Sequence, residues 1–193
     1  MLQPKRGPAR ARLVSVGFVA AVILVAVGCY PAIHPDNRPT SIAGARNGEL
    51  APSQLVTISS TCAFYWKAAP YYQAMVRDAA AAGVSLGATE CYRTLAGQQE
   101  VRNYWCSFGL CHFAAVPGTS IHGWGKAVDL HDGSGGLAFS STTFAWLEDN
   151  AWRYGFNHPG WAAEDGSAPE PWHWEWVADG GTMFPGQTIP PPT

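Results

Sequence analysis

The chain has 193 residues, of which 47% are hydrophobic and only 13% are charged, against roughly 25% charged residues in an average soluble domain. Its 9 tryptophans, 7 tyrosines, 8 phenylalanines and 21 glycines exclude a disordered polyelectrolyte and a coiled coil, because aromatic rings favour burial and glycines break helices. The formal net charge is -2, and no basic block lies beyond the N-terminus, so nothing indicates binding to nucleic acid.

Residues 1–33 have the pattern of a targeting segment. Four basic residues and no acidic residue lie in the first twelve positions, and an apolar run extends from Leu13 to Ile33. A run of about 20 apolar residues spans a bilayer, so we expect a membrane anchor. A cleaved signal peptide and a lipoprotein attached through Cys29 of Val-Ala-Val-Gly-Cys are the alternatives. Each of the three places the remainder of the chain outside the cytoplasm.

The composition changes again on both sides of a central domain. Residues 34–53 are rich in Pro, Asn, Gly and Ser and lack hydrophobic periodicity, which predicts a linker. Residues 180–193 end in a proline run and predict a flexible tail. One domain, residues 54–179, lies between them.

Three helices are predicted in this domain. Helix formers with periodic apolar positions predict a helix over 69–82 that Gly83 ends. A second helix over 95–105 is expected to expose Gln98 and Gln99. A third helix is predicted over 142–154, with Ser141 or Thr142 as its N-cap.

Strands are predicted at 84–91, 126–130 and 171–177. In the last strand three tryptophans alternate with His173 and Glu175, which places the indoles on one face and the ionisable groups on the other. The connections are too short for repeated βαβ units. The sequence therefore predicts an α+β fold with a small antiparallel sheet flanked by helices.

Four cysteines follow Cys29, and their even number favours disulfides. No pair has the C-x-x-C spacing that is typical of a structural zinc site. Cys106 and Cys111 would close a short loop, so we pair them and assign Cys62 to Cys91. Three pairings are possible, and buried free thiols are the alternative.

Two segments, 120–129 and 170–175, concentrate the ionisable residues. A catalytic zinc ion takes three N or O ligands and keeps an open position for water, and His122, Asp129 and His173 supply such a set. Glycines 123 and 125 allow the tight turn that would bring the first two ligands together.

A base must also lie beside the metal water, and Glu170 is the candidate. Pro171 bends the chain so that Glu170 and His173 can reach one point. Glu175 is the rival base. His131 is the rival ligand, because it shares a strand face with Asp129. Lys126 is expected to be solvated.

These residues resemble a known family. The patterns Ser-x-His-x-x-Gly-x-Ala-x-Asp at 120–129 and Glu-x-x-His at 170–173 are similar to those of the VanY-like zinc D-alanyl-D-alanine carboxypeptidases, which share a fold with the hedgehog signalling domain. The resemblance extends to Tyr-Arg-Thr at 92–94 with Gln99, and to 146–156. The sequence departs from the familiar pattern at Glu90, Cys91 and Ile121.

The resemblance implies that His122, Asp129 and His173 bind one zinc ion and that Glu170 is the general base. It also implies that Arg93 holds the carboxylate or the developing oxyanion of the peptide. The residues expected to contact the substrate are Ser120, Arg93, Gln99 and Trp124.

The implied substrate is the stem peptide of peptidoglycan, from which the enzyme would remove terminal D-alanine. The alternatives are an L-alanyl-D-glutamate endopeptidase of the same fold and a non-catalytic, zinc-bearing module that binds the cell wall. We expect a monomer in the bacterial cell envelope that contacts its substrate and the membrane, but no nucleic acid.

Overall fold

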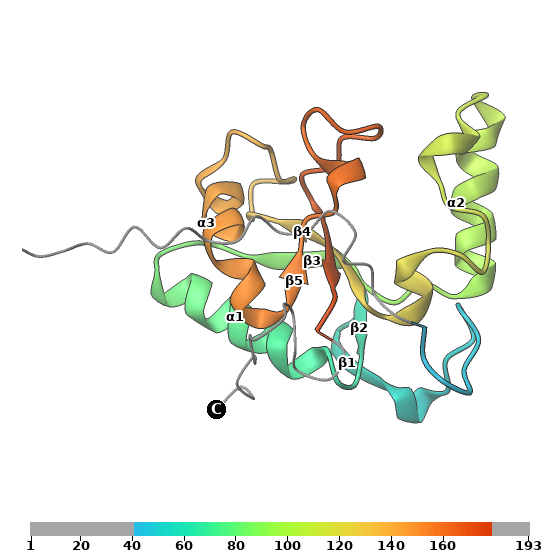
Figure 1. Cartoon of the computed structure of the whole chain (residues 1–193), viewed down its shortest axis with the longest axis horizontal. Coiled ribbons are helices and arrows are strands. Elements are labelled where there is room, and N and C mark those ends of the chain that lie inside the picture. Colours follow the sequence, from blue (N-terminus) through green and yellow to red (C-terminus); the bar gives the residue numbers. More distant parts are fainter. Residues whose placement is uncertain (1–40, 179–193) are drawn as a thin grey trace, which may run out of the picture. The chain divides into compact units, whose positions relative to one another are not determined.

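A four-stranded antiparallel sheet lies at the centre of the computed structural model, which describes residues 41–178 (Figure 1). The strands follow in the order β3 (Gly87–Glu90), β4 (Ala127–His131), β6 (His173–Trp176) and β5 (Phe156–Asn157). A second, two-stranded sheet pairs β1 (Leu55–Ser59) with β2 (Cys62–Tyr65). The predicted strands are confirmed: β3 and β6 are shorter than expected, and β4 has the expected length but begins one residue later.

The three predicted helices are present as α1 (Ala69–Ala81), α2 (Leu95–Ser107) and α3 (Thr142–Asn150). Helices α1 and α3 lie on one side of the central sheet and α2 stands on the other (Figure 1). The N-cap of α3 is Ser141, whose hydroxyl accepts a hydrogen bond from the Phe144 backbone nitrogen at 3.0 Å.

Short 3-10 helices connect these elements, and they occupy Pro52–Gln54, Cys111–Phe113, Ile121–Trp124 (η3), Ala151–Tyr154 and Gly160–Ala162. The helix predicted to reach residue 154 thus tightens after Asn150. It ends at Gly155, which has a φ of 80°.

The hydrophobic core lies on the α1 and α3 side of the sheet. Val128 and Leu130 of β4 alternate with residues on the opposite face, and so do Trp174 and Trp176 of β6; all four are buried. The third indole of the predicted stripe does not join them. Trp172 precedes the strand and is 39% exposed, so the prediction of three indoles on one strand face was wrong for this residue.

The last part of the predicted linker packs against the domain. Within residues 41–53, Ile42 and Leu50 are buried, and the Asn47 amide donates a hydrogen bond to the Ser120 backbone oxygen at 2.7 Å. The packed structure therefore begins before residue 54.

The predictions for the targeting segment 1–33, for Cys29, for linker residues 34–40 and for the tail 180–193 concern residues outside the described range. Between residues 41 and 178, no helix combines the length and the apolar character needed to cross a bilayer.

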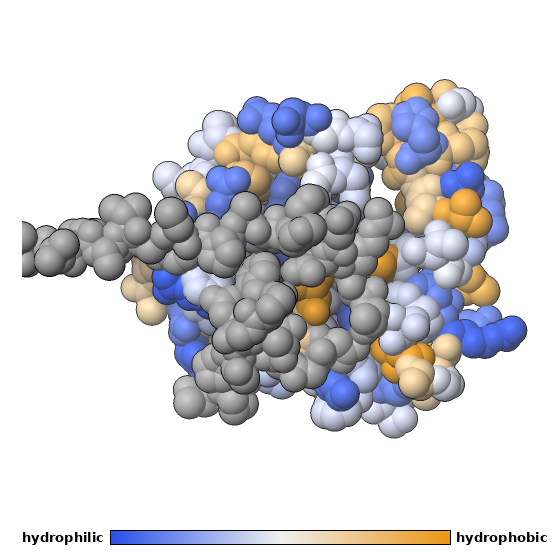
Figure 2. Space-filling view, in the orientation of Figure 1, coloured by the Kyte–Doolittle hydropathy of each residue, from blue (hydrophilic) through white to orange (hydrophobic). Residues whose placement is uncertain are grey.

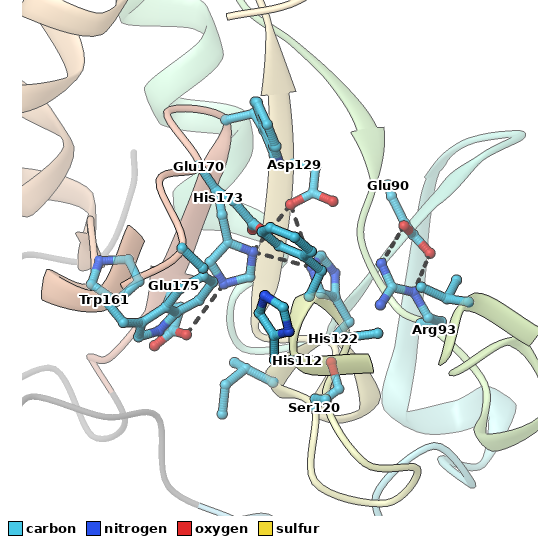
Figure 3. Close-up of a pocket in the computed structure, with 18 of the residues that line it drawn as sticks. Glu90, Arg93, His112, Ser120, His122, Asp129, Trp161, Glu170, His173 and Glu175 are labelled. Carbon is cyan, nitrogen blue, oxygen red and sulfur yellow. Dashed lines mark hydrogen bonds and ion pairs between the residues drawn. The ribbon is translucent and has the colours of Figure 1, made fainter. Parts of the chain in front are cut away.

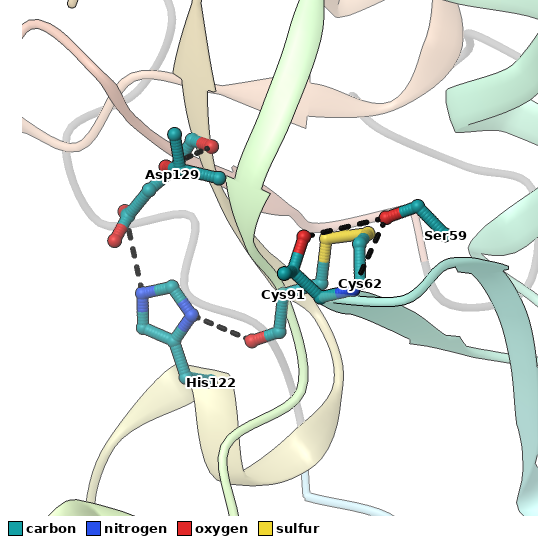
Figure 4. Close-up of a disulfide and its surroundings, with 7 residues drawn as sticks. Ser59, Cys62, Cys91, His122 and Asp129 are labelled. Carbon is teal, nitrogen blue, oxygen red and sulfur yellow. Dashed lines mark hydrogen bonds and ion pairs between the residues drawn. A yellow bond between two sulfur atoms is a disulfide. The ribbon is translucent and has the colours of Figure 1, made fainter.

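Both predicted disulfides are present. Cys62 of β2 is bonded to Cys91, which follows β3 (Figure 4), and Cys106 of α2 is bonded to Cys111. The first bridge is buried in the core. The second closes the turn after α2, where hydrophobic residues gather at the surface (Figure 2), and there the Phe108 side chain is 63% exposed.

Lys126 is fully buried, in contrast to the expected solvated position. Its ammonium nitrogen lies 5.3 Å from the Tyr65 ring centroid and 5.8 Å from that of Trp176. Backbone hydrogen bonds from Tyr65 to Gly125 and from Trp176 to Lys126 hold this segment between β2 and β6.

Candidate metal centre and cleft

Strand register places three ionisable residues in one row across the central sheet. Asp129 of β4 is directly opposite His173 of β6, and Glu90 of β3 is opposite Asp129. Side chains that are directly opposite in an antiparallel pair share a face and lie about 4.5–5.5 Å apart at Cβ. The row faces away from the core, toward α2.

His122 reaches the same place from η3, immediately before β4. The turn ends at Gly125, which has a φ of 60°, and its backbone nitrogen donates to the His122 oxygen at 2.9 Å. A Cβ at Gly125 would lie 2.7 Å from the Tyr65 backbone nitrogen. Glycine is therefore required where the chain turns from His122 into the strand of Asp129.

The three side chains converge on one point. The His122 Nε2 and His173 Nδ1 atoms are 3.3 Å apart, and Asp129 Oδ1 lies 3.1 Å from His173 Nδ1 and 3.4 Å from His122 Nε2. Tetrahedral zinc with bonds of about 2.0–2.1 Å requires its ligand atoms to be about 3.3–3.4 Å apart. The spacing of these atoms therefore fits a zinc ion.

The remaining nitrogen of each histidine has its own partner. His122 Nδ1 donates to the Cys91 backbone oxygen at 2.7 Å (Figure 4), and His173 Nε2 lies 3.2 Å from Glu175 Oε1 (Figure 3). Such hydrogen bonds leave the lone pairs of the inward nitrogens directed at one another and at Asp129. This is the arrangement in which imidazoles bind metals.

Electrostatics favours an ionised Asp129. Burial raises the pKa of this carboxyl, but the charges and hydrogen bonds of His122 and His173 lower it well below its usual range. For His173, burial opposes protonation, and hydrogen bonds to Asp129 and Glu175 outweigh it and raise the pKa to about 9. The ionised Asp129 thus attracts a cation, and a metal ion would replace the proton on His173 Nδ1.

A cleft of about 900 Å³ opens over the cluster. Its lining includes the aromatic residues Trp105, His112, Phe113, Trp161 and Trp172. Figure 3 shows Arg93 on the far side of His122 from Trp161. The ring centroids of Trp161 and His173 are 4.9 Å apart, so this indole packs directly on a candidate ligand.

Glu170 lines the cleft beside the cluster. Its backbone oxygen accepts hydrogen bonds from His173 N at 3.1 Å and from His158 Nε2 at 3.0 Å. Burial raises the pKa of its carboxyl, although the charges of His173 and Arg93 act in the opposite direction. A raised pKa suits a carboxylate that must take up and release a proton.

Arg93 also lines the cleft, next to Glu90. Its Nε donates to Glu90 Oε1 at 2.6 Å and its Nη2 to Glu90 Oε2 at 2.5 Å, while Nη1 donates to Gln98 Oε1 at 2.7 Å. A guanidinium has five N–H donors. One N–H on each terminal nitrogen is left for a ligand, a geometry that matches a carboxylate.

Two expected substrate contacts were misplaced. Gln99 is exposed, lies outside the set of residues that line the cleft and donates to Asn103 Oδ1 at 2.8 Å. Gln98, expected at the surface, is instead 2% exposed and accepts a hydrogen bond from Arg93. Gln98 lies three residues after Leu95 and seven before Trp105, so it shares a helix face with these apolar residues. Trp105 lines the cleft. That helical spacing was the signal available in the sequence.

Trp124 is half-buried and packs against the core, outside the set of residues that line the cleft. Ser120 does line the cleft, as predicted. His131 stays outside the metal cluster, and its Nδ1 accepts from the Gly133 nitrogen at 3.1 Å. His112 is exposed and lines the cleft. His158 is half-buried and packs against Trp174.

An α+β domain with a buried His-Asp-His set at the floor of a cleft, and a carboxylate beside it, is typical of metal-dependent hydrolases. The comparison with known families agrees with this class. A model of the VanY family, described as D-alanyl-D-alanine carboxypeptidase, matches residues 64–179. The chain belongs to the VanY family.

Individual relatives support the assignment. The chain is 32% identical over 124 residues to a D-alanyl-D-alanine carboxypeptidase of Enterococcus faecalis (strain ATCC 700802 / V583), a match that covers 56% of this chain and 46% of the relative. The chain thus spans about half the length of that relative.

Solved structures of related proteins have the same fold. A structure of VanYB in complex with D-alanine-D-alanine is 28% identical with a TM-score of 0.55, covering 64% of this chain and 76% of the other. A mutant of the vancomycin resistance D,D-pentapeptidase VanY in complex with Zn(II) is 26% identical with a TM-score of 0.55, covering 75% and 89%. The predicted α+β fold is confirmed.

Proposed function

We propose that this protein is a zinc-dependent D-alanyl-D-alanine carboxypeptidase that acts on the stem peptides of peptidoglycan. The observation that carries the proposal is the His122, Asp129 and His173 cluster, whose ligand atoms are spaced at 3.1–3.4 Å. Related structures that contain Zn(II) and D-alanine-D-alanine support the metal and the substrate.

When bound, zinc would supply the Lewis acid that polarises the peptide carbonyl and lowers the pKa of water. His122, Asp129 and His173 would hold the ion. Glu170 accepts the proton of the attacking water and passes it to the nitrogen of the leaving D-alanine. The raised pKa of Glu170 makes the carboxylate a stronger base and so favours the first of these two transfers.

Arg93 recognises the terminal carboxylate of the substrate. Its two remaining N–H groups form a fork, and Glu90 and Gln98 hold the guanidinium in place. A carboxypeptidase needs such a group because its substrate ends in a charge one residue beyond the scissile bond. Ser120 and Trp161 contact the peptide along the cleft.

The polymer that contains these peptides lies outside the cytoplasmic membrane. The targeting segment predicted at 1–33 would deliver the domain there, whether as an anchor, a cleaved signal or a lipoprotein. An extracytoplasmic location agrees with two disulfides, because such bonds persist in oxidising compartments.

The test is product analysis on a defined muropeptide that ends in D-alanyl-D-alanine. The full chain should release D-alanine, a chelator should stop the release, and added zinc should restore it. Glu170→Ala should lower kcat by about 10²–10⁴-fold while zinc content stays near one per chain. Glu100→Ala, an exposed carboxylate of α2, is the matched control.

Other outcomes have defined meanings. Internal cleavage without released D-alanine would favour the L-alanyl-D-glutamate endopeptidase. Peptide binding without any cleavage would favour the non-catalytic cell-wall module. Either result would overturn the proposed activity.

A further inference from the structure

Glu175 is a carboxylate in an unusual place. Its side chain is buried with 4% exposure on β6, the same strand as His173. Burying an ionised carboxylate is costly unless hydrogen bonds or charges compensate for it. Its partner is His173 Nε2, which lies 3.2 Å from Glu175 Oε1.

The contact with Glu175 determines which nitrogen of His173 carries the hydrogen and which can bind a metal. Its Nδ1 lies within 3.3 Å of both His122 Nε2 and Asp129 Oδ1, and its Nε2 faces Glu175. A neutral imidazole has one N–H and one lone pair. With the N–H on Nε2 and donated to Glu175, the lone pair is on Nδ1 and points into the cluster.

A second polar side chain, that of Asn157, neighbours Glu175 in the sheet. Asn157 of β5 is directly opposite Glu175, and on the other side of β6 the opposite residue is the small Ala127. Among residues 41–178, both amide atoms of Asn157 are buried without a hydrogen-bond partner. The register thus places an amide that can donate hydrogen bonds beside the buried carboxylate.

The position of Glu175 also separates it from the role of base. Figure 3 shows it on the Trp161 side of His173, whereas Asp129 and His122 lie on the other side. A base must reach the water over the open position of the metal, and Glu175 instead contacts the outer nitrogen of a ligand. Of the two carboxylates considered from the sequence, Glu170 is therefore the one available to the reaction.

We propose that Glu175 is a positioning residue that fixes the tautomer and orientation of His173 and thereby strengthens metal binding by the His-Asp-His set. The inference rests on the proposed function only in taking zinc as the ion. A carboxylate that accepts the outer N–H of a metal-binding histidine fixes the ring and makes it a better ligand.

The test measures zinc affinity in the full chain by competition with a chromophoric chelator, independently of activity. Glu175→Ala should weaken binding about 10–100-fold. Glu175→Gln retains an oxygen that accepts the Nε2 hydrogen and should lose less. Glu100→Ala should bind zinc like the wild type. An affinity of Glu175→Ala within threefold of wild type, with the apo proteins equally folded by circular dichroism, would overturn the proposal.

A second measurement covers the case in which Glu175→Ala fails to fold. Histidine 15N shifts in the zinc-loaded wild type should show His173 protonated at Nε2 and metal-bound at Nδ1. Metal on Nε2 would refute the inference without any variant. Absence of zinc binding by the wild type would overturn the proposed function instead, so the two failures are distinguishable.

Discussion

The structure predicts that Arg93 distinguishes a free terminal carboxylate from a neutral terminus. Replacing Arg93 by Ala removes the two N–H groups that remain after the guanidinium has bonded to Glu90 and Gln98. It should therefore affect a substrate that ends in a carboxylate far more than the same peptide with a terminal amide.

The magnitude follows from the contacts. Hydrogen bonds between charged groups contribute about 1.5–3 kcal/mol each, so two of them amount to about 3–6 kcal/mol, or about 10²–10⁴-fold in kcat/KM. The Arg93 side chain is 13% exposed, so screening by water is small. Glu90 neutralises part of its charge, and we therefore expect the lower half of the range, about 10²–10³-fold.

The assay is a cycle of two enzymes and two substrates. The kcat/KM of wild type and Arg93→Ala is measured on a peptide ending in D-alanyl-D-alanine and on its C-terminal amide, with products followed by mass spectrometry. The loss on the amide reports every effect of the substitution other than carboxylate recognition, including the loss of a partner for Glu90. Arg46→Ala, with an 84% exposed side chain, is the control.

The reasoning is refuted if Arg93→Ala lowers kcat/KM on the two substrates by factors that agree within threefold. Arg93 would then contribute only to structure or to the transition state. A loss confined to the amide is equally incompatible with the proposed clamp.

Three further predictions concern the base, the disulfide and the turn. Burial raises the pKa of Glu170 above its ordinary value of 4.5. Protonation of this base should therefore lower kcat/KM along an acid limb of the pH profile that is centred above pH 4.5. An acid limb centred at or below pH 4.5, in enzyme whose zinc content has been verified, contradicts the assignment of Glu170 as the base. Replacing Cys62 and Cys91 by Ala removes a disulfide and should lower the free energy of unfolding by about 2–4 kcal/mol. It should also weaken zinc binding in a chelator competition, because the Cys91 backbone oxygen accepts a hydrogen bond from His122 at 2.7 Å. Unchanged zinc affinity would show that the disulfide does not support His122. Gly125 has a positive φ, and Gly125→Ala would place a Cβ 2.7 Å from the Tyr65 backbone nitrogen of β2. The substitution should lower the free energy of unfolding, measured by urea titration, by at least about 1–2 kcal/mol. An unchanged urea midpoint would show that glycine is not required at this position.

The candidate ligand set could be proposed from the sequence because its chemistry is local. Few residue types bind zinc, and the glycine turn after His122 and the bend at Pro171 both precede strands, which have a period of two. Cys106 and Cys111 were paired correctly because the loop between them is short. The helices were found for the same reason, since periodicity and caps act within a few residues.

The errors concern residues whose environment is decided by distant segments. Whether Gln98 or Gln99 faces inward depends on Arg93 and on the Ala115 oxygen, to which Gln98 donates at 2.8 Å. Lys126 is buried because two backbone hydrogen bonds clamp its segment between β2 and β6. Neither contact has a signature in the adjacent sequence.

The sequence by itself determined which residue types are present to bind a metal, where the chain turns and that Cys106 and Cys111 are close enough along the chain to pair. Only the tertiary structure decided that Asp129 is opposite His173, that Trp161 and not Trp124 reaches the cleft, and that Glu175 stands behind a ligand. The physical reason is that composition and periodicity act along the chain, whereas register and burial arise from pairing between segments that are far apart in sequence.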